Sequence, residues 1–224
     1  DDRWQIFLRG FGVTIRTAVL ALVIGIVLGV LVAIIRTQHD SRRSKKNGIG
    51  TVLLNIADVI CRIYLTVIRG TPMMVQLMIM YFVIFASTRR TIMVAILAFG
   101  INSGAYVAEI VRGGIMSVDQ GQMEAGRSLG MNYKQTMRHI IIPQAIKNIL
   151  PALGNEMITL LKDTSLMTVI SAKDLTKAAQ TVTAVTYEPF MPYISIAVVY
   201  LVCVIALSKV LGLVERRLRA SDRR

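Results

Sequence analysis

The sequence predicts an all-α integral membrane protein with five transmembrane helices and a cytoplasmic helix–turn–helix loop. Hydrophobic residues make up 54% of the 224 residues. The mean hydropathy of +0.59 is too high for an ordinary soluble domain of this length. Several charge-free runs reach or approach the roughly 20 apolar residues that a helix needs to cross a bilayer core. A polar, basic stretch at residues 114–143 interrupts these runs.

The net charge of +13 comes mostly from residues that flank the predicted spans. Cytoplasmic flanks of membrane helices carry an excess of Lys and Arg, so this pattern indicates membrane topology and argues against a nucleic-acid partner. The two cysteines, Cys61 and Cys203, lie far apart in apolar segments and are expected to be free. The flanking basic residues are Arg36, Arg42, Arg43, Lys45, Lys46, Arg216, Arg217, Arg219, Arg223 and Arg224.

The number of spans follows from the positions of the basic segments. If the cluster after residue 35 and the C-terminal cluster are both cytoplasmic, an even number of spans separates them. The basic loop at 114–143 divides that number into two and two, although Arg89 and Arg90 then lie on the outer side. We expect one domain over residues 1–224, with the N-terminus outside and the C-terminus cytoplasmic. The spans are expected near 11–35, 54–86, 91–112, 146–168 and 190–212.

Two of these spans need a separate justification. The second is long and contains Gly70 and Pro72, which predict a kink because proline removes a helix hydrogen bond. The fourth is only weakly apolar, and it is included because the parity of the basic loops requires it. The third and fifth are continuous apolar runs of span length.

The stretch at 114–143 is expected to form two short helices in water. The capping-box spacing starts the first helix at Ser117, and this helix runs toward Leu129. Gly130 suits the left-handed residue that stops a helix, and Asn132 is placed to cap the second one. The alternative is an amphipathic element lying on the membrane surface, in which Glu124 is merely solvated.

Several motifs resemble those of permease subunits of type I ABC importers, in the polar amino-acid uptake family of histidine, glutamine and arginine type. They cover roughly residues 60–175 in matching order, which makes the resemblance specific. The loop resembles the EAA loop of these permeases at Glu124-Ala125-Gly126, Gly130 and Ile140-x-Ile142-Pro143. The other matching blocks are Arg69-Gly70-Thr71-Pro72 with Val75-Gln76-Leu77, Ala105-Tyr106 with Glu109 and Arg112-Gly113, Pro143-Gln144-Ala145, and residues 160–166.

The resemblance implies a multi-subunit importer in the bacterial cytoplasmic (inner) membrane. Glu124, Ala125, Gly126 and Gly130 would dock on a dimer of ATPase subunits, which would bind ATP and Mg²⁺, so this chain would need no cofactor of its own. The other implied partners are a second permease chain, identical or paralogous, an extracytoplasmic substrate-binding protein and the amino acid. Gly126 replaces the usual third alanine, which is expected to loosen the first loop helix slightly.

Two other functional classes remain open from the residues alone. An ATPase-independent small carrier or channel would show the same hydropathy. A membrane-embedded enzyme is disfavoured because the chain has no Walker lysine loop and no HExxH pattern. His39 and His139 lie in basic segments and are expected to be solvated, so no metal site is expected.

The fourth span is expected to present a polar face. At 100° per residue its polar residues fall within an arc of roughly 120°. Two carboxylates on that arc suit an ammonium group, and polar groups inside a span usually face a cavity or a partner. Alternatively, Lys162 and Asp163 lie at the outer boundary and meet headgroup water. The polar face consists of Asn155, Glu156, Thr159, Lys162 and Asp163, and all but Lys162 are proposed to line the substrate path.

A second polar stripe is expected on the third span. Asn102, Tyr106 and Glu109 recur at i, i+4 and i+7, which places them on one helix face. Glu109 is expected to pair with Arg112 at i+3, a structural role.

Overall fold

The computed structural model describes residues 3–42 and 49–220, and every regular element in these ranges is a helix. The basic residues Arg43, Lys45, Lys46, Arg223 and Arg224, on which part of the topology prediction rests, lie outside the described residues. The elements are α1 (Arg3–Arg42), α2 (Ile49–Gly70), α3 (Met73–Ile79), η1 (Met80–Ile84), α4 (Thr91–Met116), α5 (Gln120–Ser128), α6 (Tyr133–Thr136), η2 (Met137–Ile141), α7 (Ile142–Asp163), η3 (Thr164–Ile170), α8 (Leu175–Thr186) and α9 (Phe190–Ala220).

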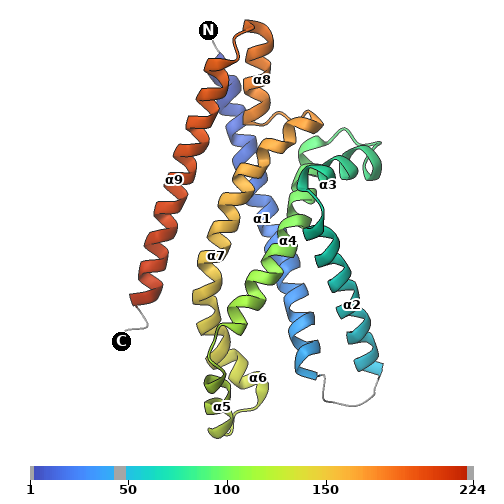
Figure 1. Cartoon of the computed structure of the whole chain (residues 1–224), viewed down its shortest axis with the longest axis vertical. Coiled ribbons are helices and arrows are strands. Elements are labelled where there is room, and N and C mark those ends of the chain that lie inside the picture. The colour runs from blue at the N-terminus through green and yellow to red at the C-terminus, as the bar shows by residue number, and fades with distance from the viewer. Residues whose placement is uncertain (1–2, 43–48, 221–224) are drawn as a thin grey trace.

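The long helices α1, α2, α4, α7 and α9 lie alongside one another (Figure 1). The short helices α5 and α6, the end of α1 and the start of α2 lie toward one end of the molecule, and α8 and the start of α1 lie at the other (Figure 1). Among the described residues, four helices are long and apolar enough to cross a membrane: Arg3–Asp40, Ile49–Gly70, Thr91–Met116 and Phe190–Leu218.

Helix α7 lies among these helices (Figure 1) but is not one of the four that are apolar enough to meet this criterion. Its 22 residues give a length of about 33 Å, which matches the roughly 30 Å thickness of a bilayer core. Its length therefore permits a fifth crossing, and five crossings remain a prediction.

The expected second span over residues 54–86 is not one continuous helix, because the chain breaks where only a kink was predicted. Helix α2 ends at Gly70, and α3 begins at Met73 after Pro72, whose extended backbone has φ −64° and ψ 136°. Proline disfavours the helical conformation of the residue before it, here Thr71. The Thr71 hydroxyl donates to the Val67 carbonyl at 2.8 Å and closes the end of α2.

The expected fourth span at 146–168 also differs from the observed helix. The α-helix begins earlier, at Ile142, where it continues α6 and the π-helical turn η2 without interruption. It ends at Asp163 and passes into the 3₁₀ helix η3, which leads to the N-terminal cap of α8.

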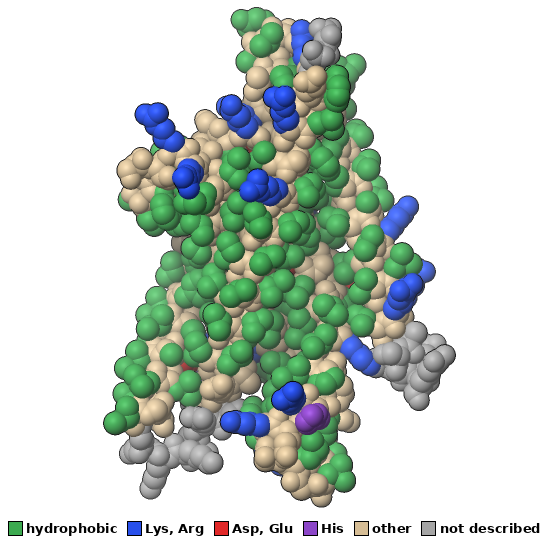
Figure 2. All heavy atoms as spheres, turned by 180° about the vertical axis from the view of Figure 1, so that it is seen from behind, with side chains coloured by type: hydrophobic (Ala, Val, Ile, Leu, Met, Phe, Trp, Pro, Cys, Tyr) green, Lys and Arg blue, Asp and Glu red, His purple; other side chains and the backbone are tan. Residues whose placement is uncertain are grey.

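Small residues bring α1 and α4 close together. A Cβ atom at Gly25 would lie 2.7 Å from the Ser103 hydroxyl oxygen, and one at Gly29 would lie 2.6 Å from Val107. Lipid supplies no hydrophobic force between membrane helices, so such close backbone approach is a main source of their packing energy. Seen from behind the view of Figure 1, the molecule carries hydrophobic side chains across its middle (Figure 2), as a lipid-facing surface requires.

Helix α8 is fastened to α1 by a capped and buried N-terminus. The Asp174 side chain is fully buried and accepts hydrogen bonds from the backbone N–H groups of Thr176, at 3.1 Å, and Lys177, at 3.0 Å. The Leu175 N–H donates to the Thr14 hydroxyl of α1 at 3.2 Å. Burial raises the pKa of the Asp174 carboxyl group, while the backbone hydrogen bonds act in the opposite direction.

We expect Asp174→Ala to lower the free energy of unfolding by about 0.5–2 kcal/mol, the usual value of an N-terminal cap. Asp174→Asn keeps the side-chain oxygen and should retain most of this stability. Thermal unfolding of the two variants in detergent measures the difference. Equal stability of the alanine and asparagine variants would contradict the assigned role of the cap.

Candidate translocation site

The polar face predicted for the fourth span is present on α7. Asn155, Thr159 and Lys162 are exposed, whereas Leu160 and Leu161 on the other side are buried. The side chains of Glu156 and Asp163 are half-buried, and both residues lie at the border of the polar face. Membrane helices place polar side chains toward water-filled space or a partner subunit, so this face is the side of α7 turned away from the apolar core.

Glu156 lies near Ser103 of α4 and within electrostatic reach of Asp163, the other acidic residue of the polar face. Lys162 compensates part of the charge of Asp163. The polar face thus carries two carboxyl groups and one ammonium group, and carboxyl groups of this kind suit a positively charged ligand.

The polar stripe on α4 meets the segment that joins α2 and α3. The Asn102 side chain donates to Gln76 of α3 at 2.9 Å. Arg69, at the end of α2, forms an ion pair with Glu109 and lies over the Tyr106 ring, with its guanidinium carbon 5.7 Å from the ring centroid. The motif at residues 69–77 thus contacts the stripe at residues 102–109.

The expected pairing of Glu109 with Arg112 is wrong. Glu109 pairs with Arg69, and Arg112 contacts Asp40 of α1 at 3.2 Å. Helical spacing permits the i+3 pair, but the neighbouring helices α1 and α2 offer each side chain a different partner. Sequence reasoning missed Arg69 as part of the site, although a charged residue within a predicted span is itself a signal of a functional position.

A cavity of about 580 Å³ lies beside this contact, between α1, α2 and α4. Arg69, Tyr106 and Glu109 form part of its wall. The polar stripe of α4 therefore borders a space large enough for a small polar molecule. The stripe lies on a different side of α4 from Ser103, the residue near Glu156. The remaining lining residues are Arg36, Arg62, Leu65, Thr66 and Gly70.

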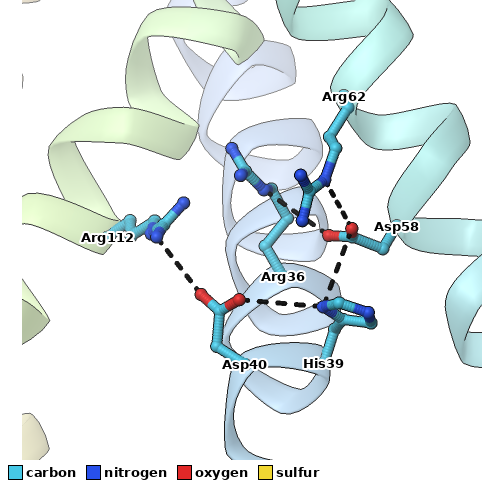
Figure 3. A network of polar contacts seen from close by, with 6 residues as sticks. All are labelled: Arg36, His39, Asp40, Asp58, Arg62 and Arg112. Atoms are coloured by element: carbon cyan, nitrogen blue, oxygen red, sulfur yellow. Dashed lines mark hydrogen bonds and ion pairs between the residues drawn. The ribbon is translucent and has the colours of Figure 1, made fainter. Parts of the chain in front are cut away.

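A network of charged residues (Figure 3) adjoins this cavity through Arg36 and Arg62, which line it. Its centre is Asp58 of α2, whose side chain is only 3% exposed. Asp58 accepts a hydrogen bond from Arg62 at 2.6 Å and lies 3.6 Å from Arg36 and 3.7 Å from His39. The prediction that His39 is solvated is therefore wrong: the last turns of α1 bring it against α2.

The loop helices α5 and α6 are joined by a tight turn. Helix α5 begins at Gln120 with Asp119 as its cap, whose carboxylate accepts the Gly121 N–H at 2.6 Å, so the predicted start at Ser117 is wrong. Ser117 instead ends α4. Gly130 has φ 79°, the left-handed conformation expected at a helix stop, and Asn132 caps α6 in a reciprocal capping box.

Gly126 has a packing role that the sequence did not reveal. It is the buried residue of α5, and a Cβ atom at this position would lie 2.5 Å from the Thr136 methyl carbon and 3.2 Å from Ile140. Glycine therefore allows α5 and α6 to touch, whereas Glu124 and Ala125 are exposed on the outer side of the pair. The expectation that Gly126 merely loosens its helix is incomplete.

We expect Gly126→Ala to separate α5 from α6 and to reduce the stability of the loop by about 1–3 kcal/mol, the usual cost of overpacking. Gly113→Ala is the matched control, because a Cβ atom there has no neighbour within 4 Å. Hydrogen exchange of the α5 amides should accelerate in the first variant and not in the second. Unchanged exchange in both would contradict the close contact of the two helices.

No group of three or more His, Cys, Asp or Glu residues that could hold a metal ion occurs among the described residues. Cys61 and Cys203 are both free, as predicted.

The fold defines a helical protein with helices of membrane-spanning length, and comparisons with known proteins specify its family. The family described as "Binding-protein-dependent transport system inner membrane component" matches residues 48–220. The chain belongs to this family, which confirms the all-helical membrane fold and the resemblance to permease subunits of ABC importers.

Individual relatives cover nearly the whole chain. A putative glutamine transport system permease protein of Rickettsia bellii is 36% identical over 95% of this chain and 93% of its own length. The arginine transport system permease protein of Bacillus subtilis is 36% identical over 96% of this chain and 93% of its own length.

The fold has counterparts among solved structures. A crystal structure of an amino acid ABC transporter with histidines superimposes with a TM-score of 0.85 at 42% identity, over 95% of this chain and 94% of the other. An inward-facing methionine ABC transporter has a TM-score of 0.78 at 18% identity, over 97% of this chain and 98% of the other, and shows the shared fold alone.

Proposed function

We propose that this chain is the permease subunit of an ATP-driven, binding-protein-dependent importer of polar amino acids. The observation that carries the proposal is the match, over nearly its full length, to permeases named for glutamine and for arginine transport. The polar face of α7 supports it, since its two carboxylates suit the ammonium group common to amino acids.

Two such permease chains, identical or paralogous, would enclose the path in the bacterial inner membrane. An extracytoplasmic binding protein would deliver the amino acid, and a dimer of ATPase subunits would supply ATP hydrolysis with Mg²⁺. The exposed side of α5, with Glu124 and Ala125, is the proposed docking surface, and Gly126 and Gly130 shape it. Closure of the ATPase dimer would move these loops and rock the permeases between inward- and outward-facing states.

The proposed substrate path follows the polar face of α7, with Asn155, Glu156, Thr159 and Asp163 as lining residues. The stripe of Asn102, Tyr106 and Glu109 on α4, which faces α2 and α3, would be a secondary polar surface beside this path. These helices belong to one packed core together with α1, so a movement of the loop at the end of α7 can reach the path through a rigid helix.

A topology experiment tests the orientation of the chain, which has the N-terminus outside. Single cysteines at Ser128 of α5 and Thr181 of α8, both exposed, should react with a membrane-impermeant maleimide from opposite sides. Ser128→Cys should be labelled only from the cytoplasm and Thr181→Cys only from outside. Labelling of both from the same side would refute the proposed number of crossings.

Uptake by the reconstituted complex tests the function itself. Expression of this chain together with its partner genes should yield a complex that contains an ATPase, and vanadate should inhibit uptake of one or more polar amino acids. Uptake that depends on neither the ATPase nor the binding protein would identify an independent carrier or channel instead. A panel that includes glutamine, arginine, histidine and glutamate would identify the substrate.

A further inference from the structure

We propose that the cavity between α1, α2 and α4 is a second binding station for the transported amino acid, at which Arg36 and Arg62 bind its carboxylate group before release. The inference rests on the proposed function and adds a site on the other side of α4 from the polar face of α7.

The cavity has the size and charge that a small zwitterion requires. Its volume is about 580 Å³, and pockets for small molecules usually measure about 300–1,000 Å³. Three arginines and one glutamate contribute charge to its wall: Arg36, Arg62, Arg69 and Glu109. The arginines give an excess of positive charge, while Glu109 offers a site for a positive group in the same space.

Arg36 and Arg62 together have more hydrogen-bond donors than their protein partners use. Their guanidinium groups converge near Asp58 (Figure 3), which is the carboxylate between them. The Arg62 Nε donates to Asp58 at 2.6 Å, but the buried Arg36 Nε lies 3.6 Å away and forms no hydrogen bond. Each guanidinium carries five N–H donors. Two adjacent cations that share one anion create a strong preference for a second anion, and a carboxylate fits the guanidinium fork.

The negative charge on the cavity wall, that of Glu109, can exchange its partner Arg69 for a ligand. Glu109 and Arg69 form an ion pair whose side chains are 43% and 41% exposed. Such an exposed pair contributes little net stability, so an incoming ammonium group can compete for Glu109. By contrast, Asp58 is buried and held by its own network, and it keeps Arg62 in place while the ligand changes.

The position of the cavity indicates the release side of the path. Arg36 follows the charge-free run at residues 17–35, at the end of α1 that points toward α5 and α6 (Figure 1). This is the end proposed to be cytoplasmic. The arginines therefore lie at the end of the molecule toward which a substrate would move as it enters the cytoplasm.

Protection of a cysteine in the cavity wall tests this inference in the assembled transporter. Thr66 lines the cavity and is exposed, so Thr66→Cys, in a background with Cys61→Ala and Cys203→Ala, should react with a water-soluble maleimide. Glutamine or arginine, whichever the complex transports, should slow this reaction. The corresponding α-amide, which lacks the carboxylate, should require a concentration roughly tenfold to a hundredfold higher.

Variants of Arg62 separate charge from geometry. Arg62→Gln should reduce protection roughly tenfold or more, and Arg62→Lys, which keeps the charge beside Asp58 but loses the planar fork, should give an intermediate value. If Arg62→Gln fails to assemble, the lysine variant still provides the comparison. Arg217→Gln on the exposed surface of α9 is the matched control and should protect like the parent.

The outcomes distinguish this inference from the proposed function. A complex that transports amino acids but shows no protection of Thr66→Cys would overturn the inference and leave the proposed function intact. Equal protection by inorganic phosphate, or protection that appears only in vesicles rich in phosphatidylglycerol, would also overturn it, since the site would then bind anions or lipid headgroups in general. Absence of any amino-acid uptake would remove the proposed function and this inference together.

Discussion

Replacing Glu124 with lysine should prevent the permease from retaining its ATPase and should abolish ATP-dependent uptake. Glu124 is exposed on α5, so its side chain can meet a partner subunit. Reversal of a charge in a docking contact replaces an attraction with a repulsion. A loss of about 2–5 kcal/mol is typical of a broken interfacial charge pair, or roughly thirtyfold to several thousandfold in affinity.

Copurification of the ATPase with the tagged permease measures this effect directly. Glu188→Lys is the matched control, because Glu188 is also exposed but lies at the opposite end of the molecule, between α8 and α9. Insertion of residues beside Gly130, whose left-handed backbone sets the turn, should act like the Glu124 variant. Normal ATPase retention and normal stimulated ATP turnover in both variants would refute the docking role.

Neutralising a carboxylate of the α7 polar face should reduce transport without affecting ATPase retention. Glu156→Gln and Asp163→Asn each remove a charge-assisted hydrogen bond to the substrate, worth about 1.5–3 kcal/mol, or roughly tenfold to a hundredfold in affinity. The effect should be larger for Glu156, which lies deeper along α7 and beside Ser103. Asp163 lies at the end of the helix next to the exposed Lys162.

The pattern across substrates identifies the group that these carboxylates bind. If they bind a cationic side chain, uptake of arginine, lysine or histidine should fall more than uptake of glutamine. If they bind the α-amino group, uptake of all of them should fall together. Glu188→Gln serves as the control for general effects of charge. Transport close to wild type for every substrate in both variants would show that Glu156 and Asp163 are boundary residues, and the path would then follow α2 and α4.

Much of the fold was predictable from local sequence, because hydropathy and helix-ending residues act over a few neighbouring positions. The apolar runs on α1, α4 and α9 coincide with helices of span length. Gly130 and Asn132 mark the turn between α5 and α6 as predicted. The predictions that failed concern helix boundaries. Asp119, and not Ser117, caps α5, and a break at Pro72 separates α3 from α2.

The candidate site was only partly predictable. One-sided periodicity was enough to place the polar face on α7, since the positions around a helix follow directly from residue spacing. The same periodicity could not assign Glu109, because two partners at permitted distances were available and Arg69 is 40 residues away in the chain. Asp58 and Arg62, at i and i+4 within a predicted span, were a local signal of a charged cluster that the sequence analysis did not use.

The amino-acid sequence alone was sufficient to predict a membrane protein with helices of span length over α1, α4 and α9, and to show which family its motifs resemble. Those properties depend on the transfer of single segments into lipid and on short-range hydrogen bonds, so each segment carries its own information. Three contacts became visible only once the helices were packed together: Gly126 against Thr136, the ion pair of Arg69 with Glu109, and Asp58 between Arg36 and Arg62 at the wall of a cavity. These contacts join residues on different helices, and their geometry depends on how closely the helix backbones approach, which no single segment specifies.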